Sequence, residues 1–224
     1  MFEQWLASPV ASYLHIPFLL AILVALEAVL SADNAVALAS IAQGLKTPQQ
    51  QRQALNIGLV AAYGLRVVLI LMAAWVQRFW QFELLGAGYL LWLVWRYYSS
   101  PLDETNHHQS FQFESLWQAI PIIAFTDLAF SLDSVTTAIA VADQTWLIIA
   151  GGTIGVIALR FLAGVFLGWL QEYPKLEEAG YLAVAVVGLR LLAHAVLPQL
   201  VPPEWAMVSL IVLVFAWGFS ERVD

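Results

Sequence analysis

The sequence predicts an all-α membrane protein, with seven transmembrane helices built as two inverted three-helix repeats plus a final helix. The first observation is composition: the 224 residues are 61% hydrophobic and 11% charged, whereas soluble domains are about half apolar and a quarter charged. The second is that long apolar segments recur along the whole chain. The third is that polar motifs of the first half reappear in the second. We therefore treat residues 1–224 as a single transmembrane domain.

A helix that spans a bilayer needs about 20 mostly apolar residues. The segments that meet this requirement are 16–42, 54–77, 83–100, 116–142, 145–170, 179–197 and 204–220. The first three form repeat one, about 16–100, the next three form repeat two, about 116–197, and the last helix, about 204–220, stands alone. A polar cytoplasmic linker, 101–115, separates the repeats. The short loop after the fifth segment is expected to be solvated and carries Glu172, Glu177 and Glu178.

The repeat is clearest in two motifs, at 27–37 and 127–137. Equivalent positions carry similar residues: Glu27 and Asp127, Ser31 and Ser131, Asp33 and Asp133, Asn34 and Ser134. The second and fifth segments also share an arginine in mid-membrane, and the third and sixth share Gly-Tyr-Leu. Because a three-span unit is odd in number, its second copy inserts with the opposite orientation. Inverted repeats are typical of secondary transporters, whose substrate site lies near the midplane between the repeats.

The orientation follows from lysine and arginine near the ends of the spans, which favour the cytoplasmic side. With the amino terminus outside, only Arg78 falls on the outer side. The cytoplasmic side then holds Lys46, Arg52, Arg96, Lys175 and Arg222. We expect a multi-pass protein with its carboxyl terminus in the cytoplasm.

Four acids and three arginines lie deep in the predicted spans. The acids are Glu27, Asp33, Asp127 and Asp133, and the arginines are Arg66, Arg160 and Arg190. An acid at bilayer depth costs at least ~2.5 kcal/mol on insertion scales, so intramembrane acids indicate function. The small excess of acid suits a cation, or a cation exchanged for protons, because neighbouring buried carboxylates share protons. Oxygen ligands without cysteine favour Mg²⁺, Ca²⁺ or Mn²⁺.

Helical spacing groups some of these residues. On a regular α-helix, Ser31 lies about 40° from Glu27, and Asn34 lies about 20° away on the other side. The equivalent stripe in the second motif consists of Asp127, Ser131 and Ser134.

The second acid of each motif lies about 100° from its stripe. Two arrangements remain open for Asp33 and Asp133. The helices unwind near Ser31 and Ser131 and so gather the acids, which we favour, or each helix is surrounded by protein and its second acid faces an arginine of a neighbour.

The three arginines also have two interpretations. Arg66 and Arg160 neutralise acids in structural ion pairs, which is the simpler hypothesis. Alternatively, an arginine takes over the acid when the cation leaves, which is a gating role, and Arg190 belongs to the same group of deep bases.

These motifs make the chain resemble the TerC family of integral membrane proteins. The resemblance rests on Glu27-x₃-Ser31-x-Asp33-Asn34, on Asp127-x₃-Ser131-x-Asp133-Ser134 and on the paired arginines, and it covers about 15–222. The family is grouped with the LysE-like exporters, several bacterial members are associated with manganese export, and members in photosynthetic organisms with thylakoid biogenesis. The resemblance thus implies a location in a bacterial inner membrane, or in the plasma or thylakoid membrane of a photosynthetic organism. The resemblance implies that a metal route is lined by Glu27, Asp33, Asn34, Asp127, Asp133 and Ser134.

The sequence-based hypothesis is thus a secondary transporter, not an enzyme, that exports a divalent cation such as Mn²⁺. Protons are the expected counter-ion, no cofactor is expected to be tightly bound, and the oligomeric state is open. The chain carries no nucleotide-binding loop, which argues against ATP as the direct energy source. The net charge of −7 argues against nucleic-acid binding.

Three alternatives belong to other classes. An exporter of a small organic cation or basic amino acid would need a roomier pocket. A membrane-protein assembly factor of the thylakoid type would tolerate neutralisation of the acids. An intramembrane aspartyl protease is disfavoured because Asp33 and Asp133 lack the Tyr-Asp and Gly-x-Gly-Asp patterns.

Overall fold

A computed structural model describes residues 17, 20–24, 34–76, 78–100, 111–141, 144–197, 199 and 201–222. Regular secondary structure in these residues is helical, apart from one isolated β-bridge between Leu45 and Phe113. The labelled helices are α3 (Pro48–Val76), α4 (Gln81–Ser99), α5 (Leu116–Val141), α6 (Thr145–Glu172), α7 (Pro174–Val196) and α8 (Glu204–Gly218). Two shorter helical stretches, 20–24 and 34–43, precede them in the chain.

Two helices begin earlier than hydropathy predicts. α3 starts at Pro48 rather than at 54, and α7 starts at Pro174 rather than at 179. Proline suits the first helical position because it has no N–H to leave unpaired and its φ is already helical. At α3, the Thr47 hydroxyl also accepts a hydrogen bond from the backbone N–H of Gln50 at 3.2 Å, as an N-cap does. The added first turns are polar, which is why an apolar window omits them.

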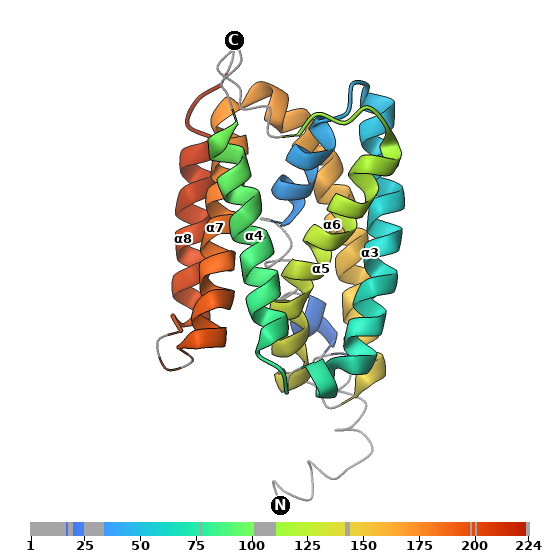
Figure 1. Ribbon diagram of the computed structural model, residues 1–224, viewed down its shortest axis with the longest axis vertical. Helices are drawn as coiled ribbons and strands as arrows, with labels where there is room; N and C mark the ends of the chain where they lie inside the picture. Colours follow the sequence, from blue (N-terminus) through green and yellow to red (C-terminus); the bar gives the residue numbers. More distant parts are fainter. Residues whose placement is uncertain are drawn as a thin grey trace, which may run out of the picture.

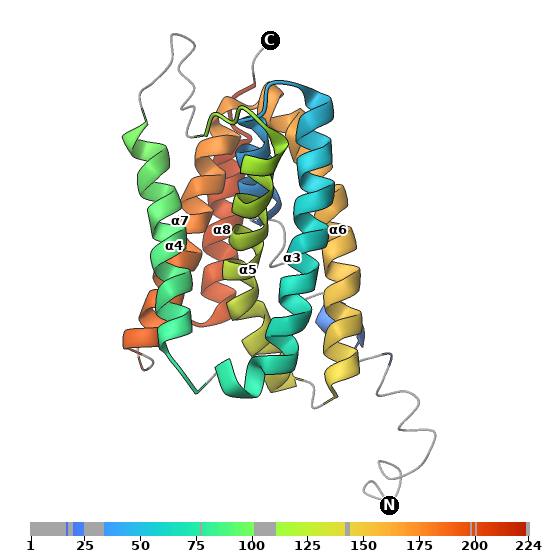
Figure 2. The ribbon, with the colours of Figure 1, turned by 45° about the vertical axis from the view of Figure 1, so that its right-hand side comes forward.

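The helices form an elongated bundle with two halves (Figure 1). The most extensive contacts join α3 to α5 and α4 to α7. α6 lies beside α3 and α8 lies beside α7, as both views show (Figure 2). α3 and α6 run in opposite directions, as do α4 and α7 (Figure 1). These directions are the ones that inverted repeats require, while the full seven-span repeat stays a prediction.

The exposed surface of the bundle indicates that the chain is an integral membrane protein. The side chains on the outside of the bundle are large and apolar, such as Val60, Leu85 and Phe161, which are 70% exposed or more. The buried set includes Arg66, Asp127 and Ser131. α3, α5, α6 and α7 are long and apolar enough to cross a membrane, and α8 contributes a shorter apolar helix. Buried charged groups inside a bundle with an apolar outer surface are the arrangement that a lipid environment favours.

The centre of the bundle is the helical stretch 34–43. Its apolar side chains from Ala35 to Ala42 are 2% exposed or less, so protein surrounds it on all sides. Alanines at 35, 37 and 39 allow neighbouring helices to approach closely, as small residues do in membranes. The closest approach is at Gly180 of α7, where an added Cβ would lie 2.4 Å from Cγ1 of Val36.

The end of the bundle at the start of α3 carries most of the basic residues that lie in loops or near helix ends. This basic end holds Lys46, Arg52, Arg96, Lys175 and Arg222, and Arg78 lies at the opposite end (Figure 1). The last residues of the predicted linker are packed here rather than solvated: Phe111 and Phe113 are buried. The Phe113 N–H donates to the Gly44 carbonyl at 2.9 Å. The other linker residues, 101–110, lie outside the described residues.

The repeat-equivalent glycines Gly88 and Gly180 provide a matched test of this packing. Gly180→Ala forces a methyl against the β-branched Val36, and overpacking of this kind costs about 1–3 kcal/mol. Gly88 has no atom within 4 Å of its added Cβ, so Gly88→Ala should stabilise α4 slightly through helix propensity. The thermal unfolding midpoint of purified protein in detergent measures both effects. Equal midpoints for the two variants would contradict the central position of 34–43.

Candidate functional site

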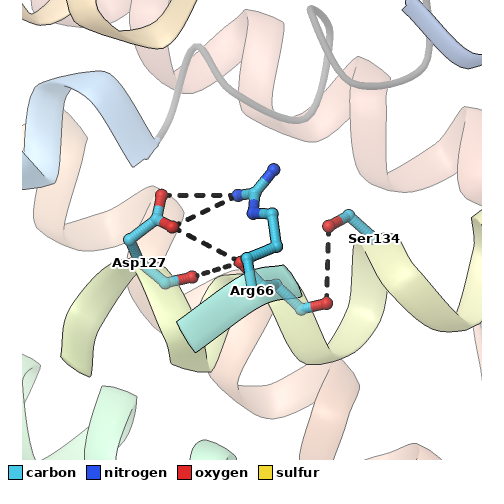
Figure 3. A network of polar contacts seen from close by, with 4 residues as sticks. Arg66, Asp127 and Ser134 are labelled. Carbon is cyan, nitrogen blue, oxygen red and sulfur yellow. Dashed lines mark hydrogen bonds and ion pairs between the residues drawn. The ribbon is translucent and has the colours of Figure 1, made fainter. Parts of the chain in front are cut away.

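The core of the candidate site is an ion pair between α3 and α5. Arg66 is 1% exposed and Asp127 is 0% exposed. Nη2 of Arg66 lies 3.4 Å from both Oδ1 and Oδ2 of Asp127 (Figure 3). Charge-assisted hydrogen bonds of this type are normally about 2.7–2.9 Å long. The contact is therefore longer than a typical charge-assisted hydrogen bond. The ion-pair role expected for Arg66 is found.

The serines of the second motif line up with Asp127 along α5. The Ser131 hydroxyl donates to the Asp127 carbonyl at 2.7 Å and reaches its Oδ2 at 3.5 Å. Ser134 donates to the Ser131 carbonyl at 3.4 Å (Figure 3). The predicted stripe is thus one face of α5, and it turns toward α3. A cavity of about 20 Å³ beside it is lined by Arg66 and Ser134, among others, which is room for about one water molecule.

Asp133 faces a different neighbour. It forms an ion pair with Arg190 of α7, and both side chains are mostly buried. α5 is a continuous helix from Leu116 to Val141, so the unwinding that we favoured near Ser131 is wrong for this motif. The second arrangement, in which the acid faces the arginine of a neighbouring helix, is the one found. The physical reason is that α7 places Arg190 beside the face of α5 on which Asp133 lies. The charge of Asp133 is neutralised there, so the helix need not unwind to bring the acids together.

Arg160 does not join this centre through the described residues. Its Nε donates to the side-chain oxygen of Asn56, across the α3–α6 contact. Both residues line an outward-facing groove of about 410 Å³, beside a 2.8 Å hydrogen bond between Tyr63 and Thr153. Within the described part of the chain, the partner of Arg160 is therefore an amide rather than the expected carboxylate. Its gating role stays a prediction.

The first motif is described only at its end. Asn34 is 5% exposed and begins the central stretch 34–43. Glu27, Ser31 and Asp33 lie outside the described residues. Before this gap, Leu23 lines the same small cavity as Arg66 and Ser134.

Sequence reasoning missed a polar contact at the basic end. Ser40 of the central stretch donates to Oε1 of Glu177 at 2.8 Å, and its oxygen lies 3.4 Å from the hydroxyl of Tyr181. The Tyr181 ring stacks on Tyr97 at 3.9 Å. Glu177 therefore belongs to the first turn of α7 and packs inward, instead of lying in a solvated loop. The sequence offered one signal for this contact, the repeated Gly-Tyr-Leu motif that contains Tyr181.

The donor chemistry of the site is oxygen from carboxylate, hydroxyl and amide groups. No group of three or more His, Cys, Asp or Glu residues that could hold a metal occurs in the residues described. Asp127 and Asp133 instead each have an arginine partner on another helix. A cation that binds either of these two carboxylates competes with its arginine.

Comparison with known proteins places the chain in a family. The model of the integral membrane protein TerC family matches residues 15–224. This chain belongs to the TerC family. No solved structure matches it.

Relatives of the TerC chain occur in well-studied bacteria. The uncharacterized membrane protein YceF of Bacillus subtilis is 34% identical over 77% of this chain and 70% of its own length. YkoY of the same organism is 32% identical over 82% of this chain and 63% of its own. The inner membrane protein YgdQ of Escherichia coli is 27% identical over 76% and 78%. The chain thus spans about two thirds of YkoY.

The Arg66–Asp127 pair makes a prediction about stability. Arg66→Met or Asp127→Leu leaves one buried charge without compensation, which costs about 3–5 kcal/mol. The double variant removes both charges and should recover most of this loss, because apolar replacements of buried pairs are often neutral. Thermal unfolding in detergent measures the cycle.

The repeat-equivalent Arg160→Met serves as the control for this cycle. It should cost less, because Arg160 is partly exposed and lines an open groove. The interpretation fails if the double variant is no more stable than the single ones, or if Arg160→Met is equally damaging.

Proposed function

We propose that this protein is a secondary transporter that exports a divalent metal cation, with Mn²⁺ as the first candidate, in exchange for protons. The observation that supports it most is the buried Asp127, paired with Arg66 in the bundle core. A charged pair at this depth is costly to retain for stability alone. Membership of the TerC family agrees with a membrane transporter.

The cation would bind on the polar face of α5. Asp127, Ser131 and Ser134 supply carboxylate and hydroxyl oxygens from one helix face. Asn34 supplies an amide, and Glu27 and Asp33 would complete the site from the other repeat. Oxygen ligands of these types suit hard divalent ions such as Mn²⁺, Mg²⁺ and Ca²⁺.

The arginines would act as internal counter-ions. When the cation is absent, Arg66 and Arg190 neutralise Asp127 and Asp133, so the site does not hold uncompensated negative charge. When the cation binds Asp127, it displaces Arg66 from a contact that is already long. The bound cation and the displaced Arg66 repel each other. Once a proton neutralises the carboxylate, this repulsion favours release of the cation.

The orientation of the protein in the membrane would follow from the charges near the helix ends, and export is proposed from the family alone. The basic end would face the cytoplasm, because lysine and arginine favour that side. The opposite end, with Arg78, would then face outward. A bacterial inner membrane is the location that we propose, in line with the inner-membrane relative YgdQ.

Flux of radioactive manganese in proteoliposomes, with a pH-sensitive dye inside, tests the proposal. Wild-type protein should carry manganese with opposing proton movement, and Asp33→Asn or Asp133→Asn should abolish it. Glu172→Gln is the control, since its ion pair with Arg222 is exposed at the basic end and such pairs contribute about 0–1 kcal/mol.

Three outcomes would contradict the proposal in different ways. Flux that survives both aspartate changes would mean that the acids are structural. Competition by basic amino acids rather than by divalent ions would indicate an organic-cation exporter. Folded wild-type protein without any flux would favour the assembly-factor hypothesis.

A further inference from the structure

A second acid–base pair lies at the end of the bundle opposite the basic end, outside the proposed cation site. Oε2 of Glu83, in the first turn of α4, lies 2.7 Å from Nδ1 of His194, in the last turn of α7. The His194 side chain is 47% exposed and the Glu83 side chain is 18% exposed. The pair therefore reaches from water at this end to the interior.

Glu83 connects this pair to the motif helix. It lines a cavity of about 10 Å³ together with Leu132 and Thr136 of α5, which is close to the volume that one water molecule occupies. Leu132 directly precedes Asp133 in the chain. α4 comes close to α5 here because Gly86, one turn after Glu83, has no side chain: an added Cβ would lie 2.6 Å from Leu132.

His194 connects the pair to the same region from α7. It follows Arg190 by four residues, so the two side chains lie one turn apart on the same face. Arg190 is the partner of Asp133. α4 and α7 thus each carry one residue of the Glu83–His194 pair and one contact with the motif at 127–137. The pair and the cavity beside Glu83 thus lie between water at this end and α5.

We propose that Glu83 and His194 form the outer proton station of the transporter. A proton taken from water by the His194 imidazole passes to the Glu83 carboxylate, and from there through a water in the cavity to the α5 motif. Two protons must enter for each divalent cation that leaves if the charge in the site is to stay the same. This inference rests on the proposed proton exchange, and assigns residues to it that lie outside the repeated motifs.

The other charged groups at this end lie on the neighbouring helices. Arg190 lies one turn before His194 on α7 and pairs with Asp133 of α5. α8 begins with Glu204 at this end, and Arg78 lies in the turn before α4. Imidazole and carboxyl groups can pass a proton between them, whereas arginine stays protonated.

A simple structural tether between α4 and α7 would behave differently from a relay. Loss of a tether would loosen the bundle and weaken every transport mode together. Loss of a relay would remove proton movement and leave the cation site intact. Manganese self-exchange, in which labelled and unlabelled manganese cross in opposite directions, needs the site but no proton.

The experiment compares these two modes in proteoliposomes with full-length protein. Glu83→Gln and His194→Gln should lower proton-coupled manganese transport by about tenfold or more, because a positioned acid or base contributes about 10²–10⁴-fold to proton transfer. Self-exchange should remain close to the wild-type rate. The swapped variant, Glu83→His with His194→Glu, should restore coupling, because it keeps one imidazole and one carboxylate in contact.

Lys175→Gln with Glu221→Gln is the matched control, an ion pair of α7 at the basic end with its atoms 2.8 Å apart. Coupling that persists in both single variants would overturn the relay alone. A parallel loss of coupling and self-exchange would assign the pair to a tether and overturn the relay as well. Wild-type manganese flux without proton movement would overturn the proposed exchange, and the relay with it.

Discussion

The buried contact between Arg66 and Asp127 is the constraint on which the rest of the bundle depends. Neither charge can be left alone in a medium of low polarity, so α3 and α5 must stay side by side at this depth. α3 and α5 share one of the two largest helix contacts in the structure. The second acid, Asp133, ties α5 to α7 in the same way. One helix thus links both halves of the bundle through charge.

Much of the fold could be predicted because membrane spans depend on local composition. α4, α5, α6 and α8 begin and end within about two residues of their apolar segments. The errors occur where the helix continues in polar residues, in the first turns of α3 and α7. Hydropathy measures transfer into lipid, so it does not detect a helix that extends into the interface. The prolines and Thr47 do indicate where these helices begin.

The site was predictable as a stripe but not as a set of contacts. Spacing alone placed Ser131 and Ser134 with Asp127, because residues three and four apart share a helix face. It could not assign a partner to Asp133, since that depends on which helix packs against its face. Glu177 was missed for the same reason: its partner, Ser40, is far away in the sequence. Tertiary proximity, rather than residue type, decides these roles.

The bridge between Leu45 and Phe113 makes the two ends of the bundle different in how their segments are held together. It joins the connection after the central stretch to the residues just before α5, through main-chain atoms that cannot rotate away as side chains can. Gly44 lets the two backbones touch, because an added Cβ would lie 2.5 Å from the Phe111 carbonyl oxygen. At the far end, α4 and α7 meet through flexible side chains. The connection before α3 and the segment before α5 are accordingly tied by backbone at the basic end, whereas α4 and α7 are tied by side chains at the opposite end.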